Sequence, residues 1–387
     1  MISTFSFQLD NRLRYGFGAS RSLDAFVKEH GWNHIALVAD QGVIPLPYFQ
    51  TVQSLLKSVA QIHLVSVRSS EEPSYDYLDQ LAETVRKIPT IDALIAIGGG
   101  SAMDIGKALA VLRTNPGPAL NYRGFDKVTV PGVPSICIPT TAGTGSEVTI
   151  NAVFTDKAEM KKLGINGRYL NATYAILDGE WTINCPLHIA VSSGMDALVH
   201  TLESFMTTNA NPLTRALNRE AFKLLYENLP ALVDAPNNPE KRQLILLGAY
   251  LAAAGLFNSG SGVAGAMSYP IGVHFKVPHG IAGGILISSI VAHNVEQGYH
   301  DYAELLDMVE QHPDWSKEKK AQRLGNAIRD LANHLGVPHT LGQWGINRQN
   351  LDHVVELMAP LQGAFNQNPV PFGTGSDARK ILLQHTE

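Results

Sequence analysis

The sequence has few cysteines, few charges and no long uninterrupted apolar run, and each shortage excludes a class of protein. Cys137 and Cys185 are the only cysteines in 387 residues, so we expect neither a disulfide framework nor a cysteine-based zinc site, and we predict a reducing cytoplasm as the location. The formal net charge is -5 and no dense block of Lys or Arg occurs. We therefore expect neither nucleic acid nor an anionic membrane as a partner.

The chain also has no segment typical of export or of membrane insertion. The first ten residues lack the cationic and apolar regions of a signal peptide. The longest apolar stretch, residues 281–292, is interrupted by Gly and Ser and is too short to cross a bilayer, so we predict a buried helix there. A small molecule is the expected partner.

The composition is typical of a compact enzyme with many tight loops. Hydrophobic residues make up 45% of the chain, which also has 34 Gly and 21 Pro. A chain of this length exceeds the size at which one hydrophobic core usually stops growing. We therefore expect two closely packed domains, with a cofactor cleft.

The order of apolar patterns predicts the fold class. Short apolar runs alternate with helical periodicity up to about residue 180, which is typical of parallel strands joined by helices; from about residue 186, long helical patterns follow. We predict an α/β dinucleotide-binding domain over residues 1–185 and an all-α domain over residues 186–387. The predicted strands are 34–40, 62–67, 93–97 and 135–138, the predicted helices include 75–87, 213–232 and 241–257, and a loop over 363–376 precedes a short terminal helix.

A glycine-rich segment follows the third of these strands. Gly98, Gly99, Gly100 and Ser101 come directly after residues 93–97 and open a predicted helix. Glycines let the backbone approach a pyrophosphate closely, and the amides and dipole at a helix start attract the anion. The spacing differs from the usual dinucleotide fingerprint G-x-G-x-x-G, so a plain strand-to-helix turn is the alternative.

Two further segments have residue types that suit a nucleotide site. Asp40 ends the first predicted strand, where a carboxylate can bind an adenosine ribose and repel a 2′-phosphate, which favours NAD over NADP. A strand-end Asp is also an ordinary turn residue. Residues 139–149 gather hydroxyls and glycines in one loop, which suits phosphate or ribose oxygens as well as a simple turn.

Three residues of the second half are candidate metal ligands. Asp196 and His200 are four residues apart in a predicted helix, so their side chains lie on one face and can converge on one ion. Such a pair is also common as a surface or capping interaction. His279 lies in a turn beside the predicted helix 281–292, and it is either a third ligand or a structural histidine.

The order of these segments resembles the signature blocks of the iron-containing (group III) alcohol dehydrogenases. The blocks are Gly98–Asp104, Pro139–Val148, Gly194–Glu203 and Pro278–Gly280, and the similarity extends over nearly the whole chain. It implies a fold shared with dehydroquinate synthase, an NAD(P)-dependent oxidoreductase that interconverts an alcohol and its carbonyl by hydride transfer, and a divalent metal, iron or zinc. It further implies a homodimer or larger homo-oligomer.

The resemblance also implies roles for individual residues. Asp40 would face the adenosine ribose, and Gly98 to Ser101 would face the pyrophosphate. The other residues that would contact the cofactor are Asp104, Thr140, Thr141, Thr144 and Lys162. Asp196, His200 and His279 would be metal ligands.

One ligand expected from the family is missing. Typical members have a histidine fourteen positions before the histidine of Pro-His-Gly, in a block that reads His-x-Met-x-His-Pro. This chain reads Gly265-Ala-Met-Ser-Tyr-Pro270, so Gly265 stands at the ligand position and Tyr269 replaces a second histidine close to the substrate. Three outcomes are open: water or substrate completes a three-ligand site, His274 substitutes as a ligand, or the metal is lost.

The substrate and the chemistry have alternatives as well. Tyr269 and His274 are the candidates for relaying a proton. Short stretches around Ser268-Tyr269 and Lys162–Asn166 are similar to the branch that includes 3-deoxy-manno-octulosonate 8-oxidase, which implies a polyol or sugar acid as the substrate. The rival functions are a dehydroquinate-synthase-like lyase, which would show no net NAD turnover, and a nucleotide-binding protein whose metal site has decayed at Gly265.

Overall fold

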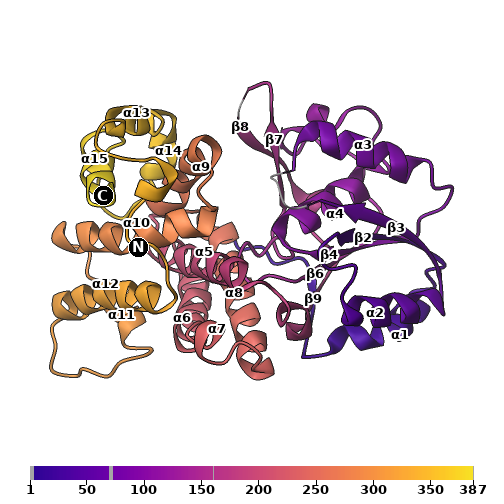
Figure 1. Cartoon of the computed structure of the whole chain (residues 1–387), viewed down its shortest axis with the longest axis horizontal. Helices are drawn as coiled ribbons and strands as arrows, with labels where there is room; N and C mark the ends of the chain where they lie inside the picture. The colour runs from indigo at the N-terminus through magenta and orange to yellow at the C-terminus, as the bar shows by residue number, and fades with distance from the viewer. Residues whose placement is uncertain (1–3, 69–72, 160, 387) are drawn as a thin grey trace. The chain divides into compact units, whose positions relative to one another are not determined.

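The structure is a computed structural model and describes residues 4–68, 73–159 and 161–386. These residues form two compact units (Figure 1). The α/β unit comprises Leu9–Thr141 and Gly145–Cys185, and the helical unit comprises the chain from Pro186 onward together with residues 4–8 and Ala142–Thr144. The predicted fold class, an α/β half followed by a helical half, is confirmed.

A six-stranded parallel sheet forms the centre of the α/β unit, in the order β1-β9-β6-β4-β2-β3. Its strands are β1 (Arg12–Tyr15), β2 (His34–Asp40), β3 (Gln61–Val67), β4 (Ala93–Gly98), β6 (Ser135–Pro139) and β9 (Tyr174–Leu177). The four strands predicted from apolar runs are therefore confirmed. Each differs from the prediction by at most one residue at either end.

Helices cover both faces of this sheet (Figure 1). Successive side chains of a strand point to opposite faces, so Ala36 and Val38 pack in the core under α3 and α4, while Ile35 and Leu37 pack in the core under α1 and α2. Because both faces are buried, the inner strands are continuously apolar rather than alternating. The helices are α1 (Leu23–Glu29), α2 (Pro47–Lys57), α3 (Tyr75–Arg86) and α4 (Gly100–Leu112).

A second, three-stranded sheet belongs to the same unit and was not predicted. Its order is β5-β8-β7, with β5 parallel and β7 antiparallel to β8. The strands are β5 (Gly124–Phe125), β7 (Asn151–Asp156) and β8 (Lys161–Asn166).

The helical unit is built around α5, α8 and α10, which pack against one another or against common neighbours. Its helices are α5 (Leu187–Met206), α6 (Pro212–Asn228), α7 (Ala231–Asp234), α8 (Pro239–Ser259), α9 (Val263–Phe275), α10 (His279–Glu296), α11 (Ala303–Leu306), α12 (Lys317–His334), α13 (Leu351–Glu356), α14 (Gln362–Phe365) and α15 (Ser376–Leu383). The apolar stretch 281–292 lies inside α10, most of which is buried. That prediction is confirmed.

Two predicted boundaries in this unit are wrong in detail. The helix predicted over residues 213–232 is divided into α6 and α7, because Pro230 has no backbone N–H to continue the helical hydrogen-bond ladder. The loop predicted over 363–376 contains most of α14, a single helical turn. The short terminal helix after it is confirmed as α15.

No single helix of the described residues is both long and apolar enough to cross a membrane. Helices α8 and α9 are long and apolar enough only when they are taken together, and a bend of 101° separates them. Cys137 is buried and Cys185 is partly buried.

Candidate active site

The order in which strands are added to the six-stranded parallel sheet reverses beside β2. From β2 it passes to the edge strand β3 and returns to β4 on the other side of β2. In open parallel sheets, ligands bind outside the carboxyl ends of the strands at such a point. Asp40 ends β2 and Gly98 ends β4, and a Cβ added to Gly98 would lie 3.1 Å from the Cβ of Asp40. The acidic residue and the glycine segment therefore lie side by side where a nucleotide is expected.

The turn from β4 into α4 needs glycine for a specific steric reason. A Cβ added to Gly98 would lie only 2.5 Å from the Cβ of Ala102, so no larger residue fits there without movement. Gly99 is the N-cap of α4 and no cap side chain accepts a hydrogen bond from the first amides. Uncapped amides at the start of a long helix are a ready anion site.

The carboxylate of Asp40 is half-buried beside this turn. Burial raises its pKa, and a hydrogen bond from the backbone N–H of Gly42 to Oδ1 opposes the rise. Among the described residues, only the backbone N–H of Gly42 donates a hydrogen bond to this carboxylate, and it donates to Oδ1 at 2.6 Å. Oδ2 is the atom that could accept a ribose hydroxyl.

The threonines after β6 lie against the same glycines. The backbone N–H of Thr140 donates to the carbonyl of Gly98 at 3.0 Å, and a Cβ added to Gly99 would lie 3.3 Å from Oγ1 of Thr141. Thr144 belongs to the helical unit with Ala142 and Gly143. A Cβ added to Gly143 would lie 2.7 Å from the Cβ of Ser193 on α5.

Asp104 and Lys107 hold the segment that follows this loop. Asp104 accepts hydrogen bonds from Oγ of Ser146 at 2.5 Å and from the backbone N–H of Val153 at 2.9 Å. The ammonium of Lys107 is fully buried and donates to the carbonyls of Ser146 at 2.7 Å and Asn151 at 2.5 Å. Lys107 was not predicted, although a lysine in the otherwise apolar stretch 105–112 was a signal that could have found it.

Lys162, the remaining predicted cofactor contact, lies on β8 of the small sheet. It pairs in register with Thr155 of β7 and is half-buried.

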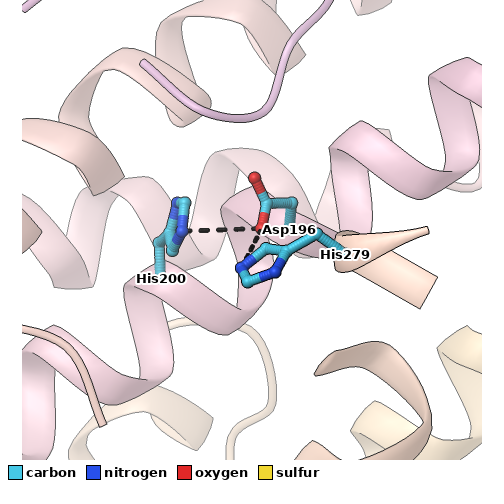
Figure 2. Close-up of side chains that lie close together, drawn as sticks. All are labelled: Asp196, His200 and His279. Atoms are coloured by element: carbon cyan, nitrogen blue, oxygen red, sulfur yellow. Dashed lines mark ion pairs between the residues drawn. The ribbon is translucent and has the colours of Figure 1, made fainter. Parts of the chain in front are cut away.

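The three predicted metal ligands come together in the helical unit (Figure 2). Asp196 and His200 lie one turn apart on α5, and His279 is the first residue of α10. Oδ1 of Asp196 lies 3.5 Å from Nε2 of His200 and 3.8 Å from Nε2 of His279. Both distances are too long for an N–H···O hydrogen bond. Two donors bound to one tetrahedral zinc ion lie about 3.4 Å apart, since each bond is about 2.0–2.1 Å long.

Burial and donor chemistry also fit a divalent ion. Asp196 is 6% exposed and His200 is 9% exposed, and a carboxylate is expensive to bury without a compensating charge. Nδ1 of His200 is buried and has no hydrogen-bond partner among the described residues. Two imidazoles and one carboxylate are a common ligand set for zinc and for iron(II). The three residues therefore fit the metal that the family resemblance implies.

A close contact between α5 and α10 brings His279 to the other two residues. A Cβ added to Gly280 would lie 1.9 Å from the carbonyl oxygen of Ser192 and 2.9 Å from the Cβ of Asp196. Only glycine allows this approach. The glycine of the Pro-His-Gly motif thus has a packing role.

Glu203 is a buried carboxylate that was not predicted. It follows Asp196 by seven positions, so it lies on the same face of α5, and this spacing was the available signal. Its Oε1 accepts hydrogen bonds from the backbone N–H groups of Ala264 at 2.6 Å and Gly265 at 3.1 Å, and its Oε2 accepts one from Gly262 at 2.9 Å. Burial raises the pKa of Glu203, and these hydrogen bonds oppose the rise. Glu203 therefore fixes the first turn of α9.

Tyr269 and His274 occupy different places on α9. The ring of Tyr269 packs against the ring of His279, with centroids 4.7 Å apart and planes tilted by 56°. His274 is exposed near the C-terminal end of the helix and is not in the group of three donors. It follows Gly265 by nine positions, which places it on the opposite face of the helix. The structure thus brings Tyr269, and not His274, to the ligands.

Comparisons with known proteins identify the family of the chain. A family model described as iron-containing alcohol dehydrogenase matches residues 10–179, and one described as the C-terminal part of the Fe-containing alcohol dehydrogenase family matches residues 190–382. A sulfoacetaldehyde reductase of Bilophila wadsworthia (strain 3_1_6) is 30% identical over 92% of this chain and 93% of that protein.

Two further relatives are also similar to this chain over most of its length. An NAD-dependent methanol dehydrogenase of Bacillus methanolicus is 28% identical over 87% of this chain and 88% of that protein. A crystal structure of a 1,3-propanediol oxidoreductase has a TM-score of 0.91 at 25% identity, over 98% of this chain and 99% of that one. The chain therefore belongs to the iron-containing alcohol dehydrogenase family and is an oxidoreductase that acts on CH–OH groups with a nicotinamide cofactor.

Proposed function

We propose that this chain is a metal-dependent alcohol dehydrogenase that uses NAD to interconvert a small alcohol and its carbonyl compound. The observation that carries the proposal is the triangle of Asp196, His200 and His279, whose donor atoms all lie within 4.8 Å of one another. The uncapped start of α4 beside Asp40 supports a dinucleotide site in the other unit.

Asp40 favours NAD as the cofactor over NADP. Its carboxylate ends β2 beside the glycine segment, where it would accept hydrogen bonds from the ribose hydroxyls and repel a 2′-phosphate. Thr141 offers a hydroxyl beside Gly99, and Thr140 is bonded to Gly98 through its backbone N–H. Asp104 acts as a positioning residue in this proposal, since its carboxylate accepts hydrogen bonds from Ser146 and Val153 and pairs with Lys107 at 3.5 Å. The contacts proposed for Thr144 and Lys162 stay predictions.

Asp196, His200 and His279 would hold iron or zinc. An ion bound by them would act as a Lewis acid that polarises the alcohol or carbonyl oxygen. The buried carboxylate of Asp196 supplies negative charge, and α5 sets the spacing of the first two ligands.

Tyr269 is the residue best placed to move the proton. In alcohol oxidation a hydride leaves the carbinol carbon for C4 of the nicotinamide, and the hydroxyl proton must leave the oxygen. The phenol of Tyr269 lies beside His279 and is 41% exposed, so it can pass that proton to solvent. His274, the other candidate, stays a prediction that its place on α9 does not favour.

A homodimer or larger homo-oligomer is part of the same proposal. Strand β1 is an edge of the six-stranded sheet, and Leu13, Tyr15 and Phe17 are each at least 40% exposed there. An exposed apolar edge strand is a surface on which a second chain can pair. The mass measured by light scattering after size exclusion tests this. The cytoplasmic location stays a prediction.

Formation of NADH by the metal-loaded protein tests the proposed function. Protein reconstituted with Fe²⁺ or Zn²⁺ should reduce NAD continuously at 340 nm when supplied with small alcohols. The same protein treated with EDTA, and a His200→Ala variant, should be inactive. Product formation without net NADH would instead indicate the lyase, and NAD binding without turnover under any metal would indicate a decayed metal site.

A further inference from the structure

A cavity of about 300 Å³ lies in the helical unit and is lined by α10, the end of α12 and the last residues of the chain. Its polar lining includes Ser288 and Ser289 of α10, Arg329 of α12 and His385, which follows α15. Among the described residues that line it, none is Asp or Glu and none is a donor of the proposed metal site. The cavity is therefore distinct from the site described above.

Ser289 and His385 form a hydrogen-bonded pair in this cavity. Oγ of Ser289 lies 2.9 Å from Nε2 of His385, and Nδ1 of the same ring lies 2.8 Å from the carbonyl oxygen of His339. A carbonyl oxygen only accepts hydrogen bonds, so Nδ1 carries the proton of the neutral ring and Nε2 is an acceptor. The hydroxyl of Ser289 therefore donates its proton toward His385.

The backbone holds both members of the pair in place. Ser289 is 9% exposed and lies in the interior of α10. The backbone N–H of Leu341 donates to the carbonyl of His385 at 2.8 Å, and the backbone N–H of His385 donates to the carbonyl of Leu382 at 2.9 Å. The serine and the imidazole are thus fixed by the fold, as a reacting pair must be.

His385 can accept a proton near neutral pH. Burial lowers the pKa of its ring, the hydrogen bond to the carbonyl of His339 opposes this shift, and the charges of Arg329 and of the His339 ring add to it. The imidazole is therefore neutral at pH 7, the form in which it acts as a base. A carbonyl behind the ring orients it but stabilises the imidazolium less than a carboxylate would.

We propose that Ser289 is a nucleophile with His385 as its general base, and that the chain hydrolyses short-chain carboxylic esters in this cavity. A nucleophile, a base within hydrogen-bond reach and a third group that orients the base are the arrangement that this chemistry requires. The volume of the cavity suits a small acyl group. The cation of Arg329 favours the negative charge that develops on the ester carbonyl oxygen. This activity is independent of the proposed dehydrogenase function.

The reaction balances with water as the only co-reactant. Oγ of Ser289 bonds to the ester carbonyl carbon while its proton passes to Nε2 of His385, and the alcohol takes that proton when the ester C–O bond breaks. Water then gives a proton to His385 and bonds to the acyl carbon. The bond from Oγ to this carbon breaks, the carboxylic acid leaves, and the proton returns to Oγ.

Labelling of the parent protein with a fluorophosphonate tests the nucleophile without any substitution. An activated serine displaces fluoride and keeps the phosphonyl group, and peptide mass spectrometry locates the modified residue. We expect one phosphonyl group per chain, on Ser289. In His385→Gln the labelling rate should fall at least about tenfold, because the base is lost. No labelling of the parent protein, or labelling at another residue, would overturn the proposal.

Hydrolysis of p-nitrophenyl acetate tests the activity. We expect the rate to fall at least about tenfold in Ser289→Ala and in His385→Gln. Ser288→Ala is the matched control, because Ser288 is the adjacent serine of the same cavity, and its rate should stay within about twofold of the parent rate. Circular dichroism should be the same for all four proteins. A rate that EDTA removes but that Ser289→Ala leaves unchanged would assign the hydrolysis to a bound metal and overturn the proposal.

Discussion

Replacement of Glu203 by glutamine tests how firmly the start of α9 is held. In the parent protein each carboxylate oxygen accepts backbone N–H groups of the first turn. A glutamine can keep the bonds to Ala264 and Gly265 with its amide oxygen. Its NH₂ group would then face the N–H of Gly262, donor against donor.

The size of the effect follows from these contacts. A lost hydrogen bond to a charged acceptor destabilises by about 1.5–3 kcal/mol, and an unsatisfied buried N–H adds to that. Removal of a buried charge returns part of this energy, because burial raises the pKa of Glu203. We expect Glu203→Gln to lower the free energy of unfolding by about 2 kcal/mol near pH 7.

Urea unfolding followed by circular dichroism at 222 nm measures this change, with EDTA present so that metal binding does not contribute. Glu304→Gln is the control in the same unit, since Glu304 pairs with Arg219 at 2.7 Å on a partly exposed surface. Such a pair contributes at most about 1 kcal/mol. A Glu203→Gln protein that is as stable as the control would refute the role assigned to Glu203.

Three further changes test other residues of the chain. Asp40→Ser should raise the ratio of kcat/KM for NADP to that for NAD by roughly tenfold or more, and an unchanged ratio in steady-state kinetics would count against the ribose contact. Burial raises the pKa of Glu147 from 4.5 to about 7, so the protonated form stabilises the fold fully below about pH 4.5, and this stabilisation is lost as the pH rises through about 7. Over about 2.5 pH units the free energy of unfolding should therefore fall by about 3 kcal/mol, at about 1.36 kcal/mol per unit. The midpoint of urea unfolding, measured from pH 4.5 to 8, should show this decrease in the parent protein and not in Glu147→Gln. Tyr269→Phe should lower kcat by at least about tenfold and leave zinc affinity unchanged, whereas an effect on KM alone would argue against proton transfer.

The strands and the chemistry-bearing residues could be predicted because their signals are local. The buried runs that became β2 and β4 are continuous in sequence, and Asp40 and Gly98 stand directly at their carboxyl ends. The i, i+4 spacing of Asp196 and His200 is equally local. His279 depended on the family resemblance, because its contact with Asp196 joins residues far apart in the chain.

The supporting residues could not be predicted for the same physical reason. The partners of Glu203 lie 59 to 62 residues further along the chain, and those of Lys107 lie 39 to 44 residues away. Periodicity shows that such residues lie in helices but not which backbone groups they contact. The break between α6 and α7 was missed although Pro230 marked it, because the apolar pattern continues across the proline.

Titration of zinc into metal-free protein, measured by calorimetry, tests most directly whether Asp196, His200 and His279 hold a metal without a fourth ligand. We predict one ion per chain, and an affinity at least about tenfold weaker in His279→Ala, with the urea midpoint in EDTA unchanged. No binding to the parent protein, or equal binding to His279→Ala, would contradict the account and favour a nucleotide-binding protein whose metal site has decayed.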